Sequence, residues 1–285
     1  MHELAPGKVN LCLFLGPVRK EDGRHELVTV YDSVSLCDEL TLTVLDAGAT
    51  DEVVCPGVEG PNLAADALAA LRASGWDAPP VRIEIVKRIP VAAGMGGGSA
   101  DAAAALRLAE RVSPVPPQTL DAIAASLGAD VPAQLRPGLS LGTGAGELIE
   151  PLAPLPEHAF AIVPLPHALA TASVYVEADR LGLGRPREEL AALRSSWPGQ
   201  LGINDLEPAA RSLCPPIDAA LAAIRSAGAE AALVCGSGPT CAGVWWGPDA
   251  RARADVGIRT LVPDFPAASV AVPVAGIGHN SEQDR

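Results

Sequence analysis

The chain has 285 residues, of which 48% are hydrophobic and 19% charged, and its formal net charge is −13. This length allows one large domain or two modest ones with a sizeable core. The negative charge argues against broad nucleic-acid binding, which needs a basic surface. No apolar run is long enough to span a bilayer, and the first residues do not resemble a signal peptide. We therefore expect a cytoplasmic protein without nucleic-acid or membrane partners.

In the first half of the chain, alternating apolar and polar residues predict β-strands at 40–45 and 81–86. Between them, residues 62–72 are rich in Ala and Leu and predict a helix with Asn62 as its N-cap. Two more helices are predicted at 100–112 and 119–127, the second ending at Gly128. Asp130 then precedes Val131-Pro132, which is typical of the cap and first turn of a third helix.

In the second half, the proline-rich stretch 151–156 predicts a hinge between domains. Strands and helices beyond it are mixed without strict alternation, which favours an α+β fold over a doubly wound sheet. The predicted strands are 159–163, 231–235, 242–246 and 269–274, and the predicted helices are 173–181, 188–195 and 217–227. Residues 276–285 are polar and predict a disordered tail.

The glycine-rich stretch 90–101 (PVAAGMGGGSAD) carries the strongest chemical signal. A strand leads into it and a helix leaves it, so its backbone N–H groups and the helix N-terminus can hold phosphate, with Ser99 expected at the helix cap. A flexible turn is the competing interpretation. The stretch lacks the Gly-Lys-Ser/Thr ending of a Walker A loop. Ser99 stands where a dinucleotide fingerprint needs its last glycine, which leaves a nucleotide-binding oxidoreductase as an alternative.

The six cysteines form no Cys-x-x-Cys pair and have no histidine at zinc-finger spacing. We expect reduced thiols packed as small hydrophobic side chains. The sequence identifies no metal-ligand set.

Three stretches in order resemble the motifs of the GHMP kinase superfamily: 5–11 (APGKVNL), the glycine-rich stretch, and 236–241 (GSGPTC). Within that superfamily the chain is similar to the 4-diphosphocytidyl-2-C-methyl-D-erythritol kinase family of the non-mevalonate isoprenoid pathway. The supporting stretches are 22–27 (DGRHEL), 127–132 (LGADVP), 141–147 (LGTGAGE) and 204–208 (NDLEP). The resemblance implies a kinase that uses ATP and Mg²⁺ to phosphorylate the 2-hydroxyl of its cytidyl substrate.

The resemblance also implies a two-domain α+β GHMP kinase fold. We expect an N-terminal ATP-binding domain at 1–153, of the ribosomal protein S5 domain 2-like kind. A C-terminal α/β sandwich domain is expected at 154–275, with the tail after it.

Phosphoryl transfer to an alcohol needs a group that takes the hydroxyl proton and positive charge that stabilises the developing alkoxide. Asp130 suits the first role. The resemblance places Lys8 next to Asp130, where it would keep the carboxylate ionised. Taken alone, Asp130 would be interpreted as a helix cap and Lys8 as a solvated side chain.

The resemblance implies further site residues. For the nucleotide they are Pro90, Val91, Ala92, Ala93, Gly94, Met95, Gly96, Gly97, Gly98, Ser99, Ala100 and Asn62. For the substrate they are Asn10, Arg24, His25, Thr171 and Tyr175. Asn62 is equally interpretable as a simple helix cap, and Tyr175 as a core aromatic. The 236–241 stretch is expected to let the backbone pass close to Lys8 and the glycine loop, or else to form a plain hairpin turn.

At Arg24 the chain departs from the family, which usually has a Tyr that stacks on cytosine. A planar guanidinium can also stack on a base, so Arg24 is expected either to replace that ring or to point into solvent. Two other hypotheses arise from the sequence: a different GHMP kinase such as homoserine kinase, and a catalytically inactive superfamily member, against which the presence of both Lys8 and Asp130 argues.

Overall fold

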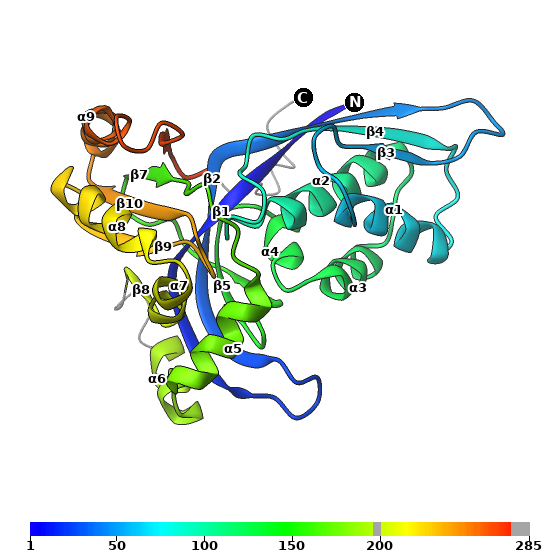
Figure 1. The fold of residues 1–285 in the computed structure, drawn as a ribbon. Helices are drawn as coiled ribbons and strands as arrows, with labels where there is room; N and C mark the ends of the chain where they lie inside the picture. Colours follow the sequence, from blue (N-terminus) through cyan, green and yellow to red (C-terminus); the bar gives the residue numbers. More distant parts are fainter. Residues whose placement is uncertain (196–200, 275–285) are drawn as a thin grey trace.

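The computed structural model describes residues 1–195 and 201–274, in which strands and helices build two sheets with helices packed on both (Figure 1). The first sheet contains β1 (His2–Val18), β2 (His25–Val44), β3 (Glu52–Val54), β4 (Val81–Val86), β5 (Leu139–Thr143), β6 (Leu148–Pro151) and β8 (Ile203–Asn204). The second contains β7 (His158–Val163), β9 (Ala231–Val234), β10 (Cys241–Trp246) and β11 (Ser269–Ala271). This mixture confirms the α+β fold class.

The helices fall into an N-terminal and a C-terminal group. The first is α1 (Leu63–Ala73), α2 (Gly97–Val112), α3 (Pro117–Leu127) and α4 (Val131–Leu135). The second is α5 (Thr171–Leu181), α6 (Arg187–Ser195), α7 (Glu207–Leu213), α8 (Pro216–Ser226) and α9 (Ala250–Leu261). Within the described residues, no helix is both long and apolar enough to cross a membrane.

The long antiparallel pair β1 and β2 runs through the middle of the molecule and ends in a hairpin that projects at the lower edge of Figure 1. One edge of β2 pairs with β1 over most of its length. The other edge pairs with β4 at residues 39–44 and with β5 at residues 29–32. On the far side of β1, β8 pairs at Cys12 and Leu13. The pair therefore carries strands from both halves of the chain.

The helix α2 covers β1 and β2 and packs against α1, α3 and α4. Its buried face is mostly alanine, from Ala100 to Ala105, and such short side chains let a helix lie close to the surface it covers. This packing fixes where α2 begins, which is the point where the glycine loop delivers the chain.

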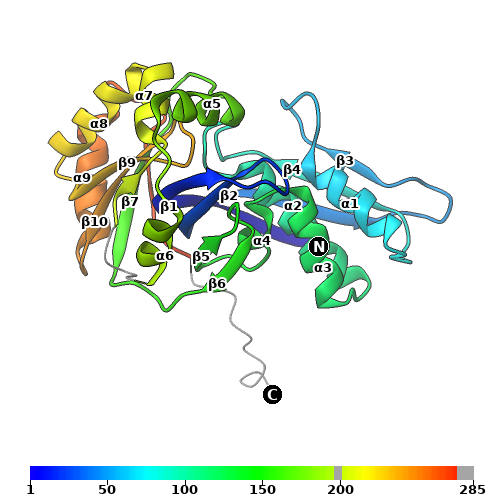
Figure 2. The same cartoon turned by 90° about the horizontal axis from the view of Figure 1, so that it is seen from below.

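The second sheet has the order β11-β7-β10-β9, with α8 and α9 on the face turned away from β1 and β2 (Figure 2). In β7, Phe160 and Ile162 enter the core shared with the first sheet, whereas Ala159, Ala161 and Val163 pack in the second core beneath these helices. A strand buried on both faces needs a continuous apolar run, which explains the stretch 159–163.

Most of the predicted elements are confirmed, including Asn62 as N-cap of α1 and Gly128 at the end of α3. The predicted strand 269–274 was too long, since β11 ends at Ala271. The sequence did not reveal α9, which has Gly257 in its interior. A Cβ there would stand 2.9 Å from the Trp245 ring, so close packing of helix on strand requires the glycine.

The division at residues 153 and 154 stays a prediction, and the expected tail lies outside the described residues. All six cysteines are free thiols, and five of them are buried.

One buried pair joins the two sheets. His158 on β7 lies 2.7 Å through Nε2 from Asp32 Oδ2 on β2, and its Nδ1 contacts the Pro156 carbonyl oxygen at 2.7 Å. Both side chains are at most 4% exposed. Burial disfavours the charged imidazole, but the hydrogen bonds with Asp32 and Pro156 and the Asp32 charge together outweigh burial and raise the pKa of His158 above its ordinary 6.5.

A raised histidine pKa in the folded state stabilises the fold at low pH, and this contribution is lost as pH rises through the folded pKa. We expect the free energy of unfolding to fall from pH 6 to pH 8 because of this pair. Urea titrations at both pH values measure it. The variant His158→Gln should lose this component of the pH dependence, and an unchanged dependence would contradict the assignment.

Candidate active site

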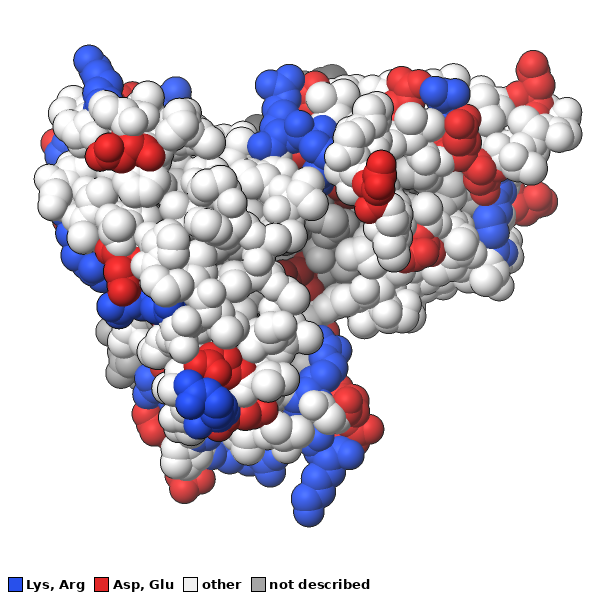
Figure 3. Space-filling view, in the orientation of Figure 1, with Lys and Arg blue, Asp and Glu red and all other residues white. Residues whose placement is uncertain are grey.

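A cleft of about 970 Å³ lies between the two halves of the molecule. Figure 3 shows this hollow with mainly uncharged walls and acidic side chains at its floor. Its walls come from β1, the β1–β2 hairpin, the glycine loop, the start of α4, α5, and the turn between β9 and β10. Segments distant in sequence therefore converge on one site.

The glycine loop joins β4 to α2 and turns through left-handed backbone at Gly94 (φ 81°) and Gly96 (φ 69°), a conformation that favours glycine. Gly96 is the N-cap of α2, so the helix begins at Gly97. The prediction of Ser99 at the cap was therefore wrong. Ser99 lies in the first turn because left-handed glycine, not a hydroxyl, starts this helix. The first N–H groups of α2 and its positive end are next to the cleft.

Two predicted nucleotide residues face away from the cleft. Met95 is 1% and Ala100 0% exposed, and both pack in the hydrophobic core. They anchor the loop, whereas the other residues of the stretch line the cleft. Asn62 both lines the cleft and caps α1, since its Oδ1 accepts the Ala64 amide at 2.9 Å. Its predicted contact with adenine stays a prediction.

The 236–241 turn lies against the glycine loop and Lys8. A Cβ on Gly94 would be 2.1 Å from the Cys235 carbonyl oxygen, and one on Gly236 would be 2.9 Å from Lys8 Nζ. Both contacts are too short for any side chain. The prediction that this motif lets the backbone pass close to Lys8 and the loop is confirmed, and the motif is also the turn between β9 and β10.

Lys8 is buried at the floor of the cleft, with 4% exposure. Its backbone amide donates to the Met95 carbonyl oxygen at 2.9 Å, which ties β1 to the glycine loop. Its Nζ donates to Asn10 Oδ1 at 2.7 Å and lies 3.5 Å from Asp130 Oδ2. Asn10 in turn donates to Thr29 Oγ1 at 2.8 Å. A buried ammonium needs such partners, so the predicted Lys8–Asp130 proximity and the place of Asn10 follow from one network.

Asp130 directly precedes α4, as expected, but its side chain makes no capping hydrogen bond. Asp130 therefore stands at the predicted N-cap position, but capping does not hold its carboxylate in place. Its Oδ1 instead accepts a hydrogen bond from the Tyr31 hydroxyl at 3.1 Å, and its Oδ2 faces Lys8. The side chain is 31% exposed, which leaves it open to the cleft.

All five predicted substrate residues line the cleft. Asn10 lies beside Lys8, and Thr171 lies beside the 236–241 turn, whereas Arg24, His25 and Tyr175 form a group at the β1–β2 hairpin. His25 is buried and contacts the Gly16 carbonyl oxygen through Nδ1 at 2.8 Å, so this nitrogen is the donor. Its Nε2 lies 3.2 Å from Asp179 Oδ1, and its ring centroid lies 5.5 Å from that of Tyr175. Arg24 is exposed beside them on the hairpin.

Helix α5 presents a stripe to this end of the cleft at spacing i, i+4 and i+8: Thr171, Tyr175 and Asp179. The Thr171 and Ser237 hydroxyl oxygens are 3.0 Å apart, which links α5 to the third motif. Tyr175 is partly buried, and burial raises the pKa of its phenol. Asp179 was not identified from the sequence, although helical spacing from Tyr175 could have indicated it.

A second charged cluster, also not identified from the sequence, lies under the glycine loop. Lys87 bridges the buried carboxylates of Asp38 and Asp101, with Nζ 2.7 Å from Asp101 Oδ2. Burial raises the pKa of Asp101 to about 7, although the Lys87 charge opposes this shift. A Cβ on Gly97 would stand 3.2 Å from Lys87 Nζ, so the cluster supports the start of α2.

Known proteins resemble this chain along most of its length. The GHMP kinases N terminal domain matches residues 62–138, and the GHMP kinases C terminal family matches residues 182–256. The 4-diphosphocytidyl-2-C-methyl-D-erythritol kinase of Mycolicibacterium gilvum is 44% identical over 83% of this chain and 79% of its own. The kinase of the same name from Streptomyces coelicolor is 41% identical over 88% of this chain and 89% of its own. The chain belongs to this kinase family.

A solved structure of 4-(cytidine 5'-diphospho)-2C-methyl-D-erythritol kinase supports the family assignment, with a TM-score of 0.75 and 34% identity. It is matched over its whole length and over 96% of this chain. Membership of a kinase family decides against the oxidoreductase alternative.

The glycine loop offers a test that separates ligand binding from folding. Gly98 is exposed, and an added Cβ would meet nothing closer than Leu63 Cδ1 at 3.6 Å. Alanine is also favoured over glycine inside a helix by about 1 kcal/mol. We expect Gly98→Ala to keep or raise the melting temperature while ATP affinity, measured by calorimetry, falls about tenfold as the methyl blocks phosphate.

Gly96→Ala is the contrasting variant. It would force a left-handed alanine whose Cβ lies 3.2 Å from Lys8 Cε, so its melting temperature should fall. Unchanged ATP affinity in Gly98→Ala would show that phosphate does not approach this turn.

Proposed function

We propose that this chain transfers the γ-phosphoryl group of ATP to the 2-hydroxyl of 4-diphosphocytidyl-2-C-methyl-D-erythritol. The observation that carries the proposal is the Lys8–Asp130 pair, which lies in one cleft between the glycine loop and the pocket of His25 and Tyr175. The names of the family members supply the substrate, and the geometry supplies a role for each end of the cleft.

The nucleotide end would hold the phosphates on backbone amides. Gly94 and the residues 96–99 bring the backbone to the cleft surface, and the positive end of α2 favours anionic oxygens there. Bound Mg²⁺ would neutralise charge on the phosphates. No cluster of three His, Cys, Asp or Glu side chains in the described residues could hold a metal. Mg²⁺ would therefore arrive with the ATP phosphates, the usual mode for this ion, and the Ser99 hydroxyl could contact either.

At the centre, Asp130 would accept the proton of the attacking hydroxyl as the new O–P bond forms and the bond to ADP breaks. Lys8 Nζ, 3.5 Å from Asp130 Oδ2, would favour the ionised carboxylate and stabilise the negative charge that develops on the oxygen. Because Lys8 is buried and fixed by Asn10, it needs little reorganisation during the reaction.

The acceptor end would recognise the cytosine base. Tyr175 offers an aromatic face, and His25 offers a ring edge held by Gly16. Thr171 lies further along the same wall. Arg24 lies on the hairpin close enough to Tyr175 for its charge to lower the pKa of that phenol, opposing the effect of burial.

Further proposals rest on composition: a cytoplasmic location, and the absence of nucleic-acid and membrane partners. The domain boundary at residues 153 and 154 also remains a proposal.

The direct test is a ³¹P NMR time course with ATP, Mg²⁺ and the cytidyl substrate. We expect a new phosphomonoester signal and stoichiometric ADP. Homoserine under the same conditions should give neither. Phosphorylation of homoserine without turnover of the cytidyl substrate would assign the chain to the alternative function.

Replacing Asp130 should remove the base and leave the fold intact, because this side chain caps no helix. We expect Asp130→Asn to lower kcat on the order of 10²–10⁴-fold with little change in the KM for ATP. Lys8→Met should also lower kcat strongly, and the double variant should be little slower than either single variant.

The matched control is Asp121→Asn, an exposed carboxylate on α3 that pairs with Arg136. It should keep the kcat of the parent. Near-normal turnover in folded Asp130→Asn would contradict the assignment of Asp130 as the base. If the losses of kcat multiply in the double variant, Lys8 and Asp130 act independently.

Variants at Arg24 test how the cytosine base is bound. If its guanidinium stacks on cytosine opposite Tyr175, Arg24→Ala should raise the KM for the cytidyl substrate about tenfold. Arg24→Tyr should preserve that KM within a few fold, and neither variant should change the KM for ATP. Parent-like KM values in Arg24→Ala would mean that Tyr175 holds the base alone.

A further inference from the structure

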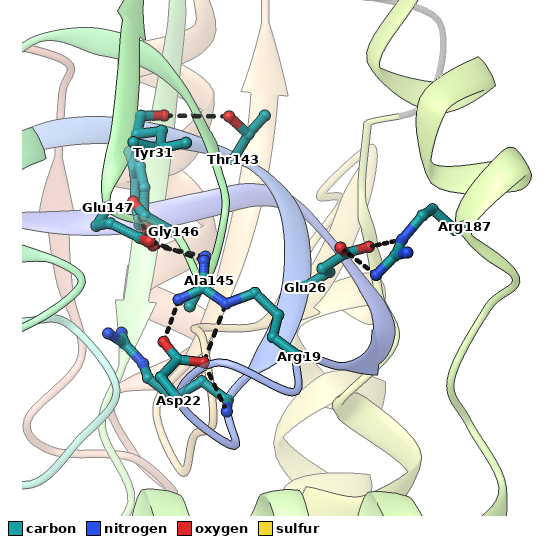
Figure 4. Close-up of polar contacts among 11 residues, drawn as sticks. Arg19, Asp22, Glu26, Tyr31, Thr143, Ala145, Gly146, Glu147 and Arg187 are labelled. Carbon is teal, nitrogen blue, oxygen red and sulfur yellow. Dashed lines mark hydrogen bonds and ion pairs between the residues drawn. The ribbon is translucent and has the colours of Figure 1, made fainter.

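The motif 141–147 (LGTGAGE) has no place in the proposed chemistry so far, although it borders the active site through Ala145. It forms the end of β5 and the turn into β6. Figure 4 shows this turn beside Tyr31 and facing the β1–β2 hairpin. Its Gly146 carbonyl oxygen lies 3.4 Å from the Tyr31 hydroxyl.

Tyr31 lies on β2 between Asn10 of β1 and Ser140 of β5, and only 2% of it is exposed. A buried hydroxyl needs a partner, and two acceptors are within reach. Asp130 Oδ1 lies at 3.1 Å and the Gly146 carbonyl oxygen at 3.4 Å. A phenol has one proton, and the shorter contact to a carboxylate is the stronger hydrogen bond. The Tyr31 hydroxyl therefore donates to Asp130.

The turn is shaped to admit this hydroxyl. A Cβ on Gly146 would come within 2.6 Å of the Tyr31 oxygen, and one on Gly142 within 2.5 Å of the Tyr31 ring. Gly146 also has a φ of 105°, which disfavours any other residue. Side chains at either position would displace the ring and with it the hydrogen bond. Two glycines of the motif thus serve the placement of Tyr31.

The same turn is linked to the β1–β2 hairpin by ion pairs and hydrogen bonds. Glu147 accepts the Ala145 amide at 2.5 Å and pairs with Arg19, whose Nη1 is 2.9 Å from Oε1. Arg19 also pairs with Asp22, and Asp22 accepts the Arg24 amide at 3.1 Å. Figure 4 shows this chain of contacts from the turn to the hairpin.

The two oxygens of the Asp130 carboxylate consequently have different surroundings. Oδ1 is occupied by Tyr31, and Oδ2 faces Lys8 at 3.5 Å. Titratable groups from other elements also face this centre: Tyr175 of α5 interacts with the charge of Asp130, and Glu147 lies beyond Tyr31. Burial and the Asp130 charge raise the pKa of Tyr31 well above its usual value, so Tyr31 remains a donor.

We propose that Tyr31 is a positioning residue for phosphoryl transfer: its hydroxyl fixes the Asp130 carboxylate through Oδ1 and leaves Oδ2, beside Lys8, to accept the substrate proton. The proposal rests on Asp130 being the base of the proposed function. It gives the 141–147 turn its purpose, which is to hold Tyr31 in place.

The test compares Tyr31→Phe with Ser140→Ala. Tyr31→Phe removes one oxygen and keeps the ring. Ser140 lies opposite Tyr31 in the sheet, and its buried hydroxyl has no hydrogen-bond partner among the described residues, so Ser140→Ala removes a neighbouring hydroxyl without breaking a described hydrogen bond. We expect kcat to fall about tenfold in Tyr31→Phe and to stay unchanged in Ser140→Ala, with the KM for ATP unchanged in both.

A pH profile separates positioning from packing. Tyr31 stabilises the ionised carboxylate, so its loss should move the acid limb of the pH–kcat profile of Tyr31→Phe to higher pH. The double variant Tyr31→Phe/Asp130→Asn should be no slower than Asp130→Asn alone. A lower melting temperature with unchanged kcat and unchanged acid limb would overturn the proposal, as would multiplicative losses in the double variant.

A second variant keeps the test sound if Tyr31→Phe folds poorly. Site-specific 3-fluorotyrosine at position 31 retains ring and hydroxyl but is a stronger donor, so the acid limb should move to lower pH. An unmoved limb would overturn the positioning role. If Asp130→Asn itself turns over normally, the base assignment fails. The inference alone is overturned if Asp130→Asn is slow but Tyr31→Phe has the kcat of the parent and 3-fluorotyrosine does not move the acid limb. In that case the base assignment stands.

Discussion

The candidate active site depends on backbone packed around the buried Lys8 side chain. The glycine loop passes at Gly96, where a Cβ would lie 3.2 Å from Lys8 Cε, and the β9–β10 turn passes at Gly236, where a Cβ would lie 2.9 Å from Nζ. Any side chain at these positions would push the ammonium away from Asn10 and Asp130. One closely surrounded charge therefore fixes the relative positions of three motifs that are far apart in sequence.

The same centre explains how two halves of the chain form one site. β1 provides Lys8 and Asn10, and β2 provides Tyr31. Asp130 comes from the start of α4, and the turn at Gly236 joins β9 to β10 in the second sheet. Each of these side chains has at least one polar partner from a different element, as in the contact of Tyr31 with Asp130. Polar networks of this kind link elements by geometry that apolar packing alone would not impose.

Sequence reasoning located the elements with clear periodicity and the motifs with unusual composition, such as β4, α1 and the glycine loop. It did not delimit β1, because a strand buried on both faces shows no alternation, and it did not find α9, where Gly257 makes room for Trp245. Within the site, Lys8 and Asp130 came from the family resemblance. Tyr31 and Lys87 were not found, because their roles depend on partners that only the folded chain brings near. Ser99 was misplaced because left-handed glycine replaced the expected hydroxyl cap.

The β1–β2 ribbon has a consequence for the choice of acceptor. In the proposed function, phosphoryl transfer would take place near Lys8 of β1, whereas the base pocket would be anchored at Gly16 of the same strand, through the contact of His25 Nδ1 with the Gly16 carbonyl oxygen. The distance between Lys8 and Gly16 is set by the β1 residues between them. These residues are hydrogen-bonded to β2 along one edge of the strand and to β8 along part of the other edge. Such a segment resists stretching, so β1 keeps a fixed distance between the position of the base and the position of the reacting hydroxyl. If the base binds at His25 as proposed, an acceptor one phosphate shorter or longer would fail to bring its hydroxyl to the Lys8–Asp130 pair.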